Sequence, residues 1–557
     1  MIEMLIVTVA ALVVIAAATV AGPRMGVAAP LVLVVVGVAV SFVPAFDSVH
    51  IDPELILAGV LPPLLYSAAV SMPTMNFRRE FGAISGLSVI LVVLSSLVLG
   101  LFFMLVLPEL GFAWGVALGA IVSPTDAVAT SIIKRQPVSR RVVAMLDGES
   151  LLNDATALVL LRTAIVATAA SFSFWRVAAS FSYSVLVALV VGGVVGWLNL
   201  VVRKRVHDPA VNTLLSFTVP FVASIPAELL NASGLVAAVV AGLLTGIRAP
   251  RELSPQHRLS DKQNWRTVEL VLEGAVFLTM GVQLRAVVTD VQQDHAGVGA
   301  AVLVAIGALV LTILVRAAYV APLLGILARR ARRSERLQSK LETMQTRMQT
   351  SAGKQETLER LNARSRRTVT DRDLERFAVR ITRGLADLDY FRREPLGWRE
   401  GTVVVWAGMR GAVTVAAAQT LPDDTPQRAV LVLIAFAVAT MSLVVQGGTI
   451  GPLVRHLRTD VDQEAVDEQN EAERTRLFDL LREGAATVRE PTIPESAPRP
   501  ERFAQQRTYR LAVLAAQRTA LLDARDNGTF DSDVLENALA NVDADQTAIE
   551  LRSKLAA

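Results

Sequence analysis

The stretch Gly148-Glu149-Ser150-Leu151-Leu152-Asn153-Asp154 carries two carboxylates, an amide and a hydroxyl inside a long apolar segment. That segment predicts a membrane-spanning helix over 141–170, because about 20 apolar residues cross a bilayer. Ionisable groups in hydrocarbon are costly unless they are paired, protonated or in contact with water, so they indicate a functional site. Residues four apart share a helix face, which places the four polar side chains on one broad face turned toward other helices. A buried polar network that only fixes helix packing is the alternative interpretation.

Composition places this stretch in a polytopic membrane protein. Of the 557 residues, 53% are hydrophobic and 19% are charged, a profile typical of a chain with many membrane spans. The charges concentrate in two regions. This predicts a membrane domain at 1–327 and 401–457, a charged cytoplasmic helical insertion at 328–400 and a cytoplasmic helical tail at 458–557. The net charge of +3 gives no indication of a nucleic-acid partner, and without Cys the chain has no disulfide or thiolate metal site.

Apolar segments of the required length occur thirteen times, eleven before the insertion and two after it. Lys and Arg should collect on alternate, cytoplasmic loops. If all of these segments cross the membrane, one set of loops contains only Arg176, Arg285 and Arg428, whereas the other set is rich in Lys and Arg. We therefore predict thirteen membrane-spanning helices, with the N-terminus outside and the C-terminus in the cytoplasm.

Two of the predicted helices are interrupted near the middle of the membrane. Helix five, 112–133, contains Ser123-Pro124-Thr125-Asp126, and helix twelve, 402–420, contains Gly408-Met409-Arg410-Gly411. Proline and paired glycines weaken a helix, and backbone groups freed at this depth must line a cavity or bind something. The interruptions occupy corresponding places if helices one to six and eight to thirteen form inverted repeats, which is typical of secondary transporters. A simple proline kink is the alternative for helix five.

The charges beside these interruptions have predicted partners. Asp126 is placed to complement the free amides of a half-helix and Arg410 the free carbonyls, while the carbonyl and hydroxyl of Thr125 can face a cation. A buried guanidinium at Arg316 needs a counter-ion, and Glu149 is the natural candidate. That pairing leaves the other carboxylate of the opening stretch without a partner. Three further charges remain unassigned: Glu269, Glu273 and Arg162.

The two charged regions are predicted to be helical and solvated. The insertion is rich in Arg, Glu, Gln and Lys, with apolar residues at helical spacing, which predicts a hairpin of helices. In the tail, the acidic segment 523–533 does not match a calcium-binding loop, because Arg525 interrupts the required alternation of Asp and Asn. We predict instead a turn between two helices, with Gly528 near a helix end.

Taken together, these motifs resemble the monovalent cation/proton antiporter-1 family, the sodium/proton exchangers. The opening stretch carries the resemblance most specifically. The two interrupted segments, the segment around Arg316 and the run Leu61-Pro62-Pro63-Leu64-Leu65-Tyr66 support it. The resemblance spans the predicted membrane domain, and it implies two inverted six-helix repeats with crossed broken helices.

The resemblance also implies two groups of site residues. The first group binds the cation and the proton alternately, and consists of Asp154 together with Asn153, Ser150 and Thr125. The second group holds the site together through charge, and consists of the pair Glu149 and Arg316 and of Asp126 and Arg410 at the crossing of the broken helices.

The implied function is sodium/proton exchange across the plasma membrane by alternating access, without a cofactor, by a homodimer in the lipid bilayer. Electrogenic relatives carry a second Asp where this chain has Asn153, so the resemblance implies electroneutral one-for-one exchange. Many relatives follow Pro-Pro-Leu-Leu-Phe with Glu, whereas this chain has Tyr66-Ser67, which leaves the choice between sodium and potassium open. Gly192 and Gly196 are expected to permit close helix packing.

Other functions predict other features. A potassium/proton exchanger is the closest alternative. A cation channel would be expected to carry a repeated pore loop, which the sequence lacks. A membrane sensor would signal through the tail, whose cytoplasmic regulator is unknown. An enzyme is not expected, because no nucleophile is paired with a base and the five His lie at loops and helix ends.

Overall fold

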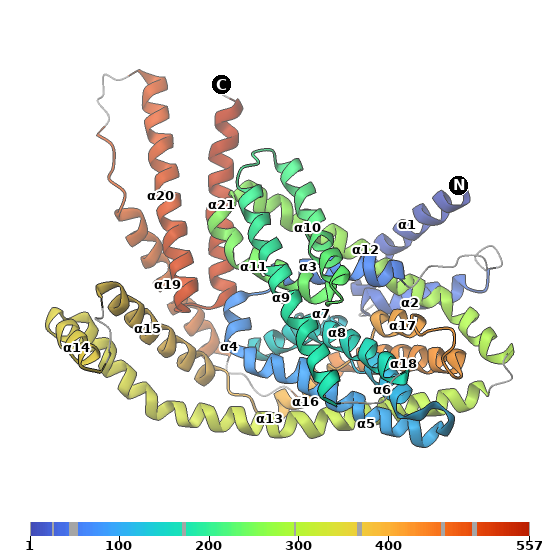
Figure 1. The fold of residues 1–557 in the computed structure, drawn as a ribbon. Helices are drawn as coiled ribbons and strands as arrows, with labels where there is room; N and C mark the ends of the chain where they lie inside the picture. Colours follow the sequence, from blue (N-terminus) through green and yellow to red (C-terminus); the bar gives the residue numbers. More distant parts are fainter. Residues whose placement is uncertain are drawn as a thin grey trace. The chain divides into compact units, whose positions relative to one another are not determined.

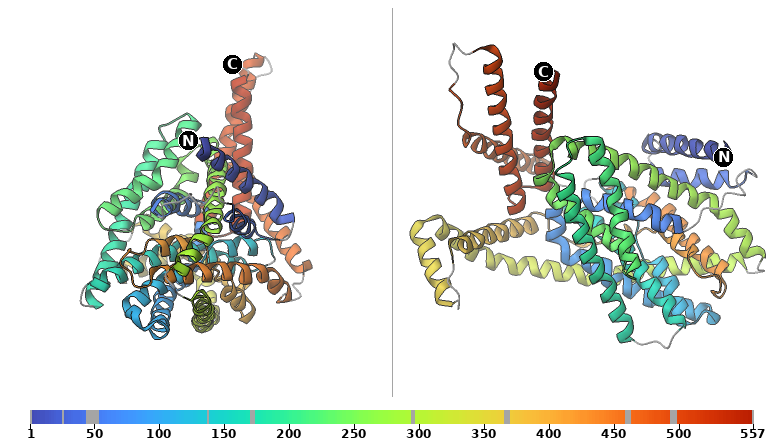
Figure 2. Two further views of the ribbon diagram at one scale, coloured as in Figure 1. Left: turned by 90° about the vertical axis from the view of Figure 1, so that its right-hand side faces the viewer. Right: turned by 45° about the horizontal axis from the view of Figure 1, so that its top comes forward.

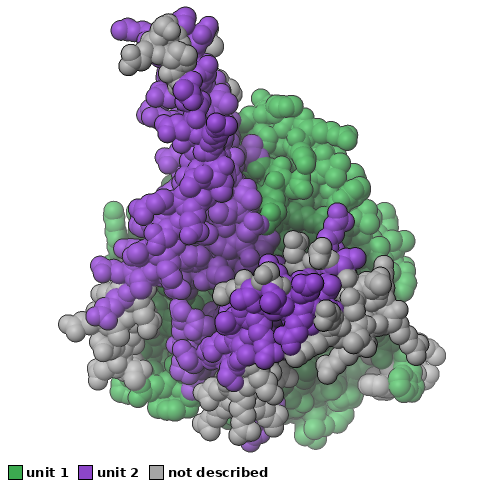
Figure 3. All heavy atoms as spheres, turned by 90° about the vertical axis from the view of Figure 1, so that its left-hand side faces the viewer, with its two compact units in different colours: residues 1–253, 257–323, 398–457 green, residues 254–256, 324–397, 458–557 purple. Residues whose placement is uncertain are grey.

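The computed structural model describes residues 2–24, 27–43, 54–136, 138–169, 174–293, 297–364, 370–457, 463–492 and 498–555. Helices are the only regular secondary structure in these ranges. The chain divides into two compact units, which Figure 3 shows in different colours. Unit 1 comprises 1–253, 257–323 and 398–457, and unit 2 comprises 254–256, 324–397 and 458–557.

Unit 1 is built from helices, most of them apolar, and Figures 1 and 2 show their course. In chain order they are α1 (Ile2–Arg24), α2 (Ala29–Val40), α3 (Leu61–Ser71), α4 (Thr74–Ser85), α5 (Leu91–Val106), α6 (Gly111–Val122), α7 (Val128–Ile133), α8 (Arg140–Ala169), α9 (Phe174–Arg203), α10 (Pro209–Leu229), α11 (Gly234–Glu252), α12 (Pro255–Gln293), α13 (Val298–Gln349), α16 (Trp398–Trp406), α17 (Ala412–Gln419) and α18 (Arg428–His456). Among the described residues, nine helical segments are long and apolar enough to cross a membrane, and three more apolar helices are shorter. The predicted all-helical membrane fold is confirmed, whereas the number of thirteen spans stays a prediction.

Two helices extend beyond the ends expected from hydropathy. The tenth predicted span, 265–284, lies inside the longer α12, and the predicted boundary at residue 328 lies inside α13, which continues to Gln349 without a break (Figure 1). Hydropathy detects where a helix leaves the bilayer, but polar residues with high helix propensity carry the same helix onward. The end of a span and the end of a helix are therefore different positions in this chain.

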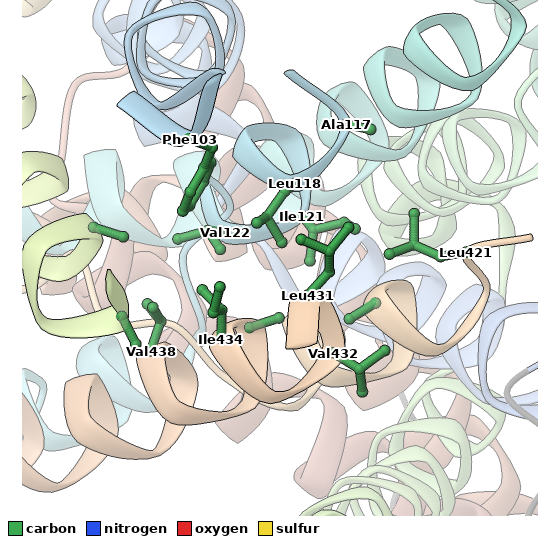
Figure 4. Packing of buried hydrophobic residues seen from close by; sticks show 14 of the residues in the cluster. Phe103, Ala117, Leu118, Ile121, Val122, Leu421, Leu431, Val432, Ile434 and Val438 are labelled. Atoms are coloured by element: carbon green, nitrogen blue, oxygen red, sulfur yellow. The ribbon is translucent and has the colours of Figure 1, made fainter. Parts of the chain in front are cut away.

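The interior of unit 1 is an apolar cluster drawn from helices distant in sequence (Figure 4). Phe103 of α5, Leu118 and Ile121 of α6, and Leu431 and Ile434 of α18 are at most 1% exposed. Lipid tails are as apolar as these side chains, so close packing rather than transfer from water holds membrane helices together. This cluster fixes α6 against α18 next to the interruptions described below.

Glycines allow two helix pairs to approach closely. A Cβ at Gly115 of α6 would lie 2.5 Å from the carbonyl oxygen of Gly100 on α5. A Cβ at Gly192 of α9 would lie 2.3 Å from the Ala237 carbonyl oxygen of α11, and Gly196 faces Ala241 of the same helix. The close packing expected for Gly192 and Gly196 is therefore found within the chain.

Within its described residues, unit 2 contains the polar end of α13 and five further helices, which are α14 (Ser351–Arg364), α15 (Asp371–Arg393), α19 (Gln463–Ala486), α20 (Arg499–Asn527) and α21 (Ser532–Leu555). Helices α20 and α21 run side by side (Figures 1 and 2) and bury Leu521 and Leu535 between them and α19. Gly528 ends α20 with a left-handed φ of 71°, a conformation that glycine adopts without strain. The predicted turn between two helices is confirmed.

Candidate functional site

The two interrupted helices touch each other at their breaks. Residues 123–127 separate α6 from α7, and residues 407–411 separate α16 from α17. The backbone amide of Asp126 donates a hydrogen bond to the carbonyl oxygen of Met409 over 2.7 Å. Each break therefore satisfies part of the backbone that the other exposes, which is the requirement for non-helical backbone at membrane depth.

Asp126 lies at the N-termini of two half-helices. Its Oδ1 accepts a hydrogen bond from the Val128 amide, in the first turn of α7, over 2.9 Å. Its Oδ2 lies against Gly411, the residue that precedes α17, where an added Cβ would be only 1.4 Å away. Helix N-termini present free amides and a partial positive charge, so one carboxylate serves both half-helices. The sequence predicted one half-helix end for Asp126, whereas the structure places its carboxylate at two.

Arg410 complements the opposite ends. Its Nε donates to the carbonyl oxygen of Val122, the last residue of α6, over 3.0 Å, and its Nη1 donates to the Gly408 carbonyl. The backbone amide of Arg410 donates to Ser442 Oγ of α18 over 2.9 Å. The side chain is only 2% exposed, so these carbonyls replace water as its hydrogen-bond partners. The two breaks are thus held by one acid and one base.

We expect Gly411→Ala to abolish the sodium/proton exchange that the sequence resemblance implies. The backbone at Gly411 is extended, with φ −131°, so an alanine is not strained there, but its Cβ would overlap Asp126 Oδ2. Displacing that carboxylate uncouples the two half-helices. Ion exchange in proteoliposomes measures the loss, with Gly448→Ala as the control, because nothing lies within 4 Å of a Cβ at that position. Undiminished exchange by Gly411→Ala would show that the contact is dispensable.

Glu149 of α8 and Arg316 of α13 form a buried ion pair. Both nitrogens of the guanidinium fork bond the carboxylate, with Nη2 2.7 Å from Oε2, and each side chain is 2% exposed. Arg316 Nε also donates to the Val404 carbonyl over 2.9 Å, and Thr125 Oγ1 donates to Glu149 Oε1 over 3.3 Å. Bidentate pairing of this kind satisfies the hydrogen-bonding groups of both charges. The structure therefore brings together the two residues that the sequence predicted to pair.

Asn153 connects α8 to the first break. Its Nδ2 donates to the Thr125 hydroxyl over 2.6 Å and to the Thr125 carbonyl over 3.2 Å. Its Oδ1 is buried and has no hydrogen-bond partner in the described part of the chain. A buried oxygen without a partner carries a desolvation penalty of about 1–3 kcal/mol. The free oxygen thus identifies a place where a cation or a proton donor would be stabilised.

Asp154 differs from every other predicted charge of the site. It is 9% exposed, and no hydrogen bond or ion pair joins its carboxylate to another described residue. The charged group that acts on its carboxylate is Asp126, another acid, which repels a negative charge on Asp154. The hydroxyl of Ser150, one turn earlier on the same helix, donates a hydrogen bond to the Asp147 carbonyl over 3.1 Å. Its hydroxyl makes no hydrogen bond to the other predicted cation ligands among the described residues.

Helix α12 contributes two carboxylates that the sequence left unassigned. Glu273 lies close enough to Asp126 and to Glu269 to be repelled by both, and no hydrogen bond or ion pair holds it within the described residues. Glu269, one turn earlier, lies near Ser67 on α3 and near the cationic Lys134. The sequence showed two acids four residues apart in an apolar helix. It did not show which neighbouring helices these acids face.

Arg162, also unassigned, pairs with Glu228 at 3.2 Å, with side chains 61% and 44% exposed. Exposed pairs contribute little to stability. Arg162 therefore lies outside the buried charge arrangement around Asp126.

The chain is similar to known sodium/proton exchangers. The family model described as sodium/hydrogen exchanger, transmembrane, matches residues 8–350 and 376–456. The chain is 26% identical over 582 residues to an uncharacterized sodium/proton exchanger of Mycobacterium tuberculosis, covering 98% of this chain and 96% of the relative. It is 29% identical over 277 residues to a sodium, potassium, lithium and rubidium/proton antiporter of Bacillus pumilus, covering 48% of this chain and 41% of the relative.

Among solved structures, the sodium proton antiporter MjNhaP1 of Methanocaldococcus jannaschii has the same fold, with a TM-score of 0.55 and 14% identity over 82% of this chain and 99% of that one. The family match includes both helix interruptions and the α8 cluster between them. This chain belongs to the sodium/hydrogen exchanger family of membrane transporters.

Proposed function

We propose that the chain exchanges sodium for protons across the plasma membrane, and that Asp154 binds either the cation or the proton. The observation that carries this proposal is the unpaired state of one carboxylate. Glu149, Arg316, Asp126 and Arg410 all have bonded partners, whereas Asp154 has none among the described residues. Intramembrane carboxylates without a partner are typical of ion and proton pathways.

The oxygen atoms around Asp154 suit a small hard cation. Such ions prefer carboxylate, carbonyl and hydroxyl ligands. The free Oδ1 of Asn153 and the carbonyl and hydroxyl of Thr125 lie together at the break, and the Ser150 hydroxyl lies one turn away on α8. We assign all four residues to the cation site, with Asp154 as its only direct carboxylate.

Competition at one carboxylate would couple the two ions. Only the deprotonated carboxylate binds a cation, so cation binding releases the proton. Burial disfavours the charged form of an acid. The empty charged site therefore crosses the low-dielectric barrier poorly, whereas the protonated or cation-bound site crosses as a neutral unit. One Asp with Asn153 beside it gives electroneutral one-for-one exchange, without a cofactor.

The crossed breaks supply the framework for alternating access. We propose thirteen spans in two inverted repeats, with the N-terminus outside and the C-terminus in the cytoplasm. The membrane domain is 1–327 and 401–457, the insertion 328–400 and the tail 458–557 lie in the cytoplasm, and the transporter works as a homodimer in the bilayer. Asp126 and Arg410 keep the two half-helix pairs together as access changes.

Potassium is the second candidate cation. The Bacillus pumilus relative is named for sodium, potassium, lithium and rubidium, and Ser67 stands where many exchangers carry a carboxylate. Dissipation of a pH gradient in proteoliposomes by sodium, potassium, lithium and rubidium, at several pH values, separates the candidates. A response to sodium and lithium supports the proposal, a larger response to potassium supports the alternative, and no cation response contradicts both.

Glu273 is expected to assist cation entry to this site. Its negative charge near Asp126 attracts a cation by about 1 kcal/mol at an effective dielectric of ~20 with screening. Glu273→Gln should therefore raise the KM for sodium about fivefold with the maximal rate nearly unchanged. Glu228→Gln removes an exposed acid of α10 and serves as the control. An unchanged KM would remove Glu273 from the cation path.

A further inference from the structure

A pocket of about 450 Å³ lies where the C-terminal ends of α9 and α11 meet. Three basic residues and one acid line it, namely Lys204, Arg205, Arg248 and Glu252. Trp197 and Leu200 line its apolar side. The pocket belongs to neither helix break, and the exchange cycle described above does not use it.

The charges in the pocket are unbalanced. Lys204 Nζ pairs with Glu252 Oε2 over 2.7 Å. The guanidinium groups of Arg205 and Arg248 make no hydrogen bond or ion pair with another residue of the described chain. Basic residues are common at helix C-termini and in cytoplasmic loops, but those roles do not require a hollow between them. Guanidinium groups match phosphate oxygens in pairs, so the pocket is suited to a phosphate group.

An apolar stripe leads away from the pocket along α9. Leu186, Val190, Val194 and Trp197 are 61%, 66%, 57% and 53% exposed. Their spacing of three to four residues places them on one face of the helix, and a large exposed apolar face on a membrane-spanning helix contacts lipid chains. Trp197 at the end of the stripe is typical of the membrane–water interface.

We propose that this pocket binds one anionic glycerophospholipid. Arg205 and Arg248 hold the phosphate, Lys204 adds positive charge at the headgroup, and the acyl chains lie along the α9 stripe. Basic pockets between membrane helices bind anionic headgroups in this way. The adjoining apolar stripe selects a lipid over a free phosphate ion, because inorganic phosphate gains nothing from it.

The test uses the full-length protein in detergent after removal of bound lipid. Phosphatidylglycerol and phosphatidylcholine are titrated separately, and native mass spectrometry counts the bound lipid while a melting curve reports the thermal midpoint. We expect phosphatidylglycerol to bind more tightly and to raise the midpoint. The double variant Arg205→Gln, Arg248→Gln should bind phosphatidylglycerol about thirtyfold less tightly, since each basic residue contributes about 1 kcal/mol, and should bind phosphatidylcholine as before.

Three controls keep the outcome decisive. Arg24→Gln with Arg135→Gln removes two exposed arginines elsewhere and should keep the preference for phosphatidylglycerol. Arg205→Lys with Arg248→Lys should retain most of that preference even if the glutamine variant is unstable. Inorganic phosphate at matched ionic strength should not compete. Equal binding of the two lipids, an unchanged preference in the glutamine double variant, lost preference in the lysine double variant, or displacement by inorganic phosphate would each overturn the proposal.

Discussion

Asp154→Asn should reduce sodium-dependent dissipation of a pH gradient to the leak rate of protein-free liposomes. Asparagine keeps the shape of the side chain and an oxygen ligand, but it can neither release a proton nor neutralise a cation. Both half-reactions of the exchange are lost at once. The measurement is the recovery of a pH-sensitive dye after addition of sodium to proteoliposomes with an internal acid load.

Asp147→Asn is the matched control for this result. Asp147 lies on the same helix and pairs with Lys134 at 2.8 Å, with a side chain that is 22% exposed. Removing it changes the same chemical group outside the proposed cation site, so exchange should persist. Retention of full exchange by Asp154→Asn, or an equal loss in both variants, would refute the assignment of Asp154.

Breaking the pair of Glu149 and Arg316 should destabilise the protein by about 3–5 kcal/mol. In Glu149→Gln the guanidinium of Arg316 remains buried without a carboxylate, and an uncompensated buried charge strongly destabilises the folded protein. We expect a lower yield and a lower thermal midpoint of the protein in detergent. Glu149→Met combined with Arg316→Met should recover part of the midpoint, because no charge is then left buried.

The exposed ion pair of Arg162 and Glu228 serves as the stability control for the buried pair. Arg162→Gln should change stability by less than about 1 kcal/mol. A Glu149→Gln variant as stable as Arg162→Gln would contradict a structural role for the buried pair. Loss of exchange with unchanged stability would instead assign Glu149 directly to ion binding.

Features of the fold that depend on local sequence were predictable. Apolar length predicts membrane helices, and the predicted membership in the exchanger family is confirmed. Pro124 predicted the first helix interruption, and Gly408 and Gly411 predicted the second, because proline and glycine weaken a helix. The placement of Asp126 at the amide end of a half-helix followed from similar reasoning, because free helix amides in a membrane need an acceptor. Its contact with Gly411 was not predicted.

Features that depend on which helix faces meet were not predictable. Arg141 and Arg203 lie at the ends of predicted spans, where charged side chains usually contact water, yet they are 3% and 1% exposed. Arg141 pairs with Glu80 at 2.6 Å, and Arg203 pairs with Asp261 and donates to Asn212 over 2.8 Å. Hydropathy counts these charges at the ends of spans, but it carries no information on the neighbouring helix. Glu273 was left unassigned for the same reason.

The central claim is that a cation and a proton compete for one carboxylate, and cation-triggered proton release tests it most directly. Sodium is added to the purified protein in weakly buffered detergent while a pH indicator records released protons. We predict release of about one proton per bound sodium, saturating together with sodium binding, and no release from Asp154→Asn. Sodium binding without proton release, or undiminished release from Asp154→Asn, would contradict the claim.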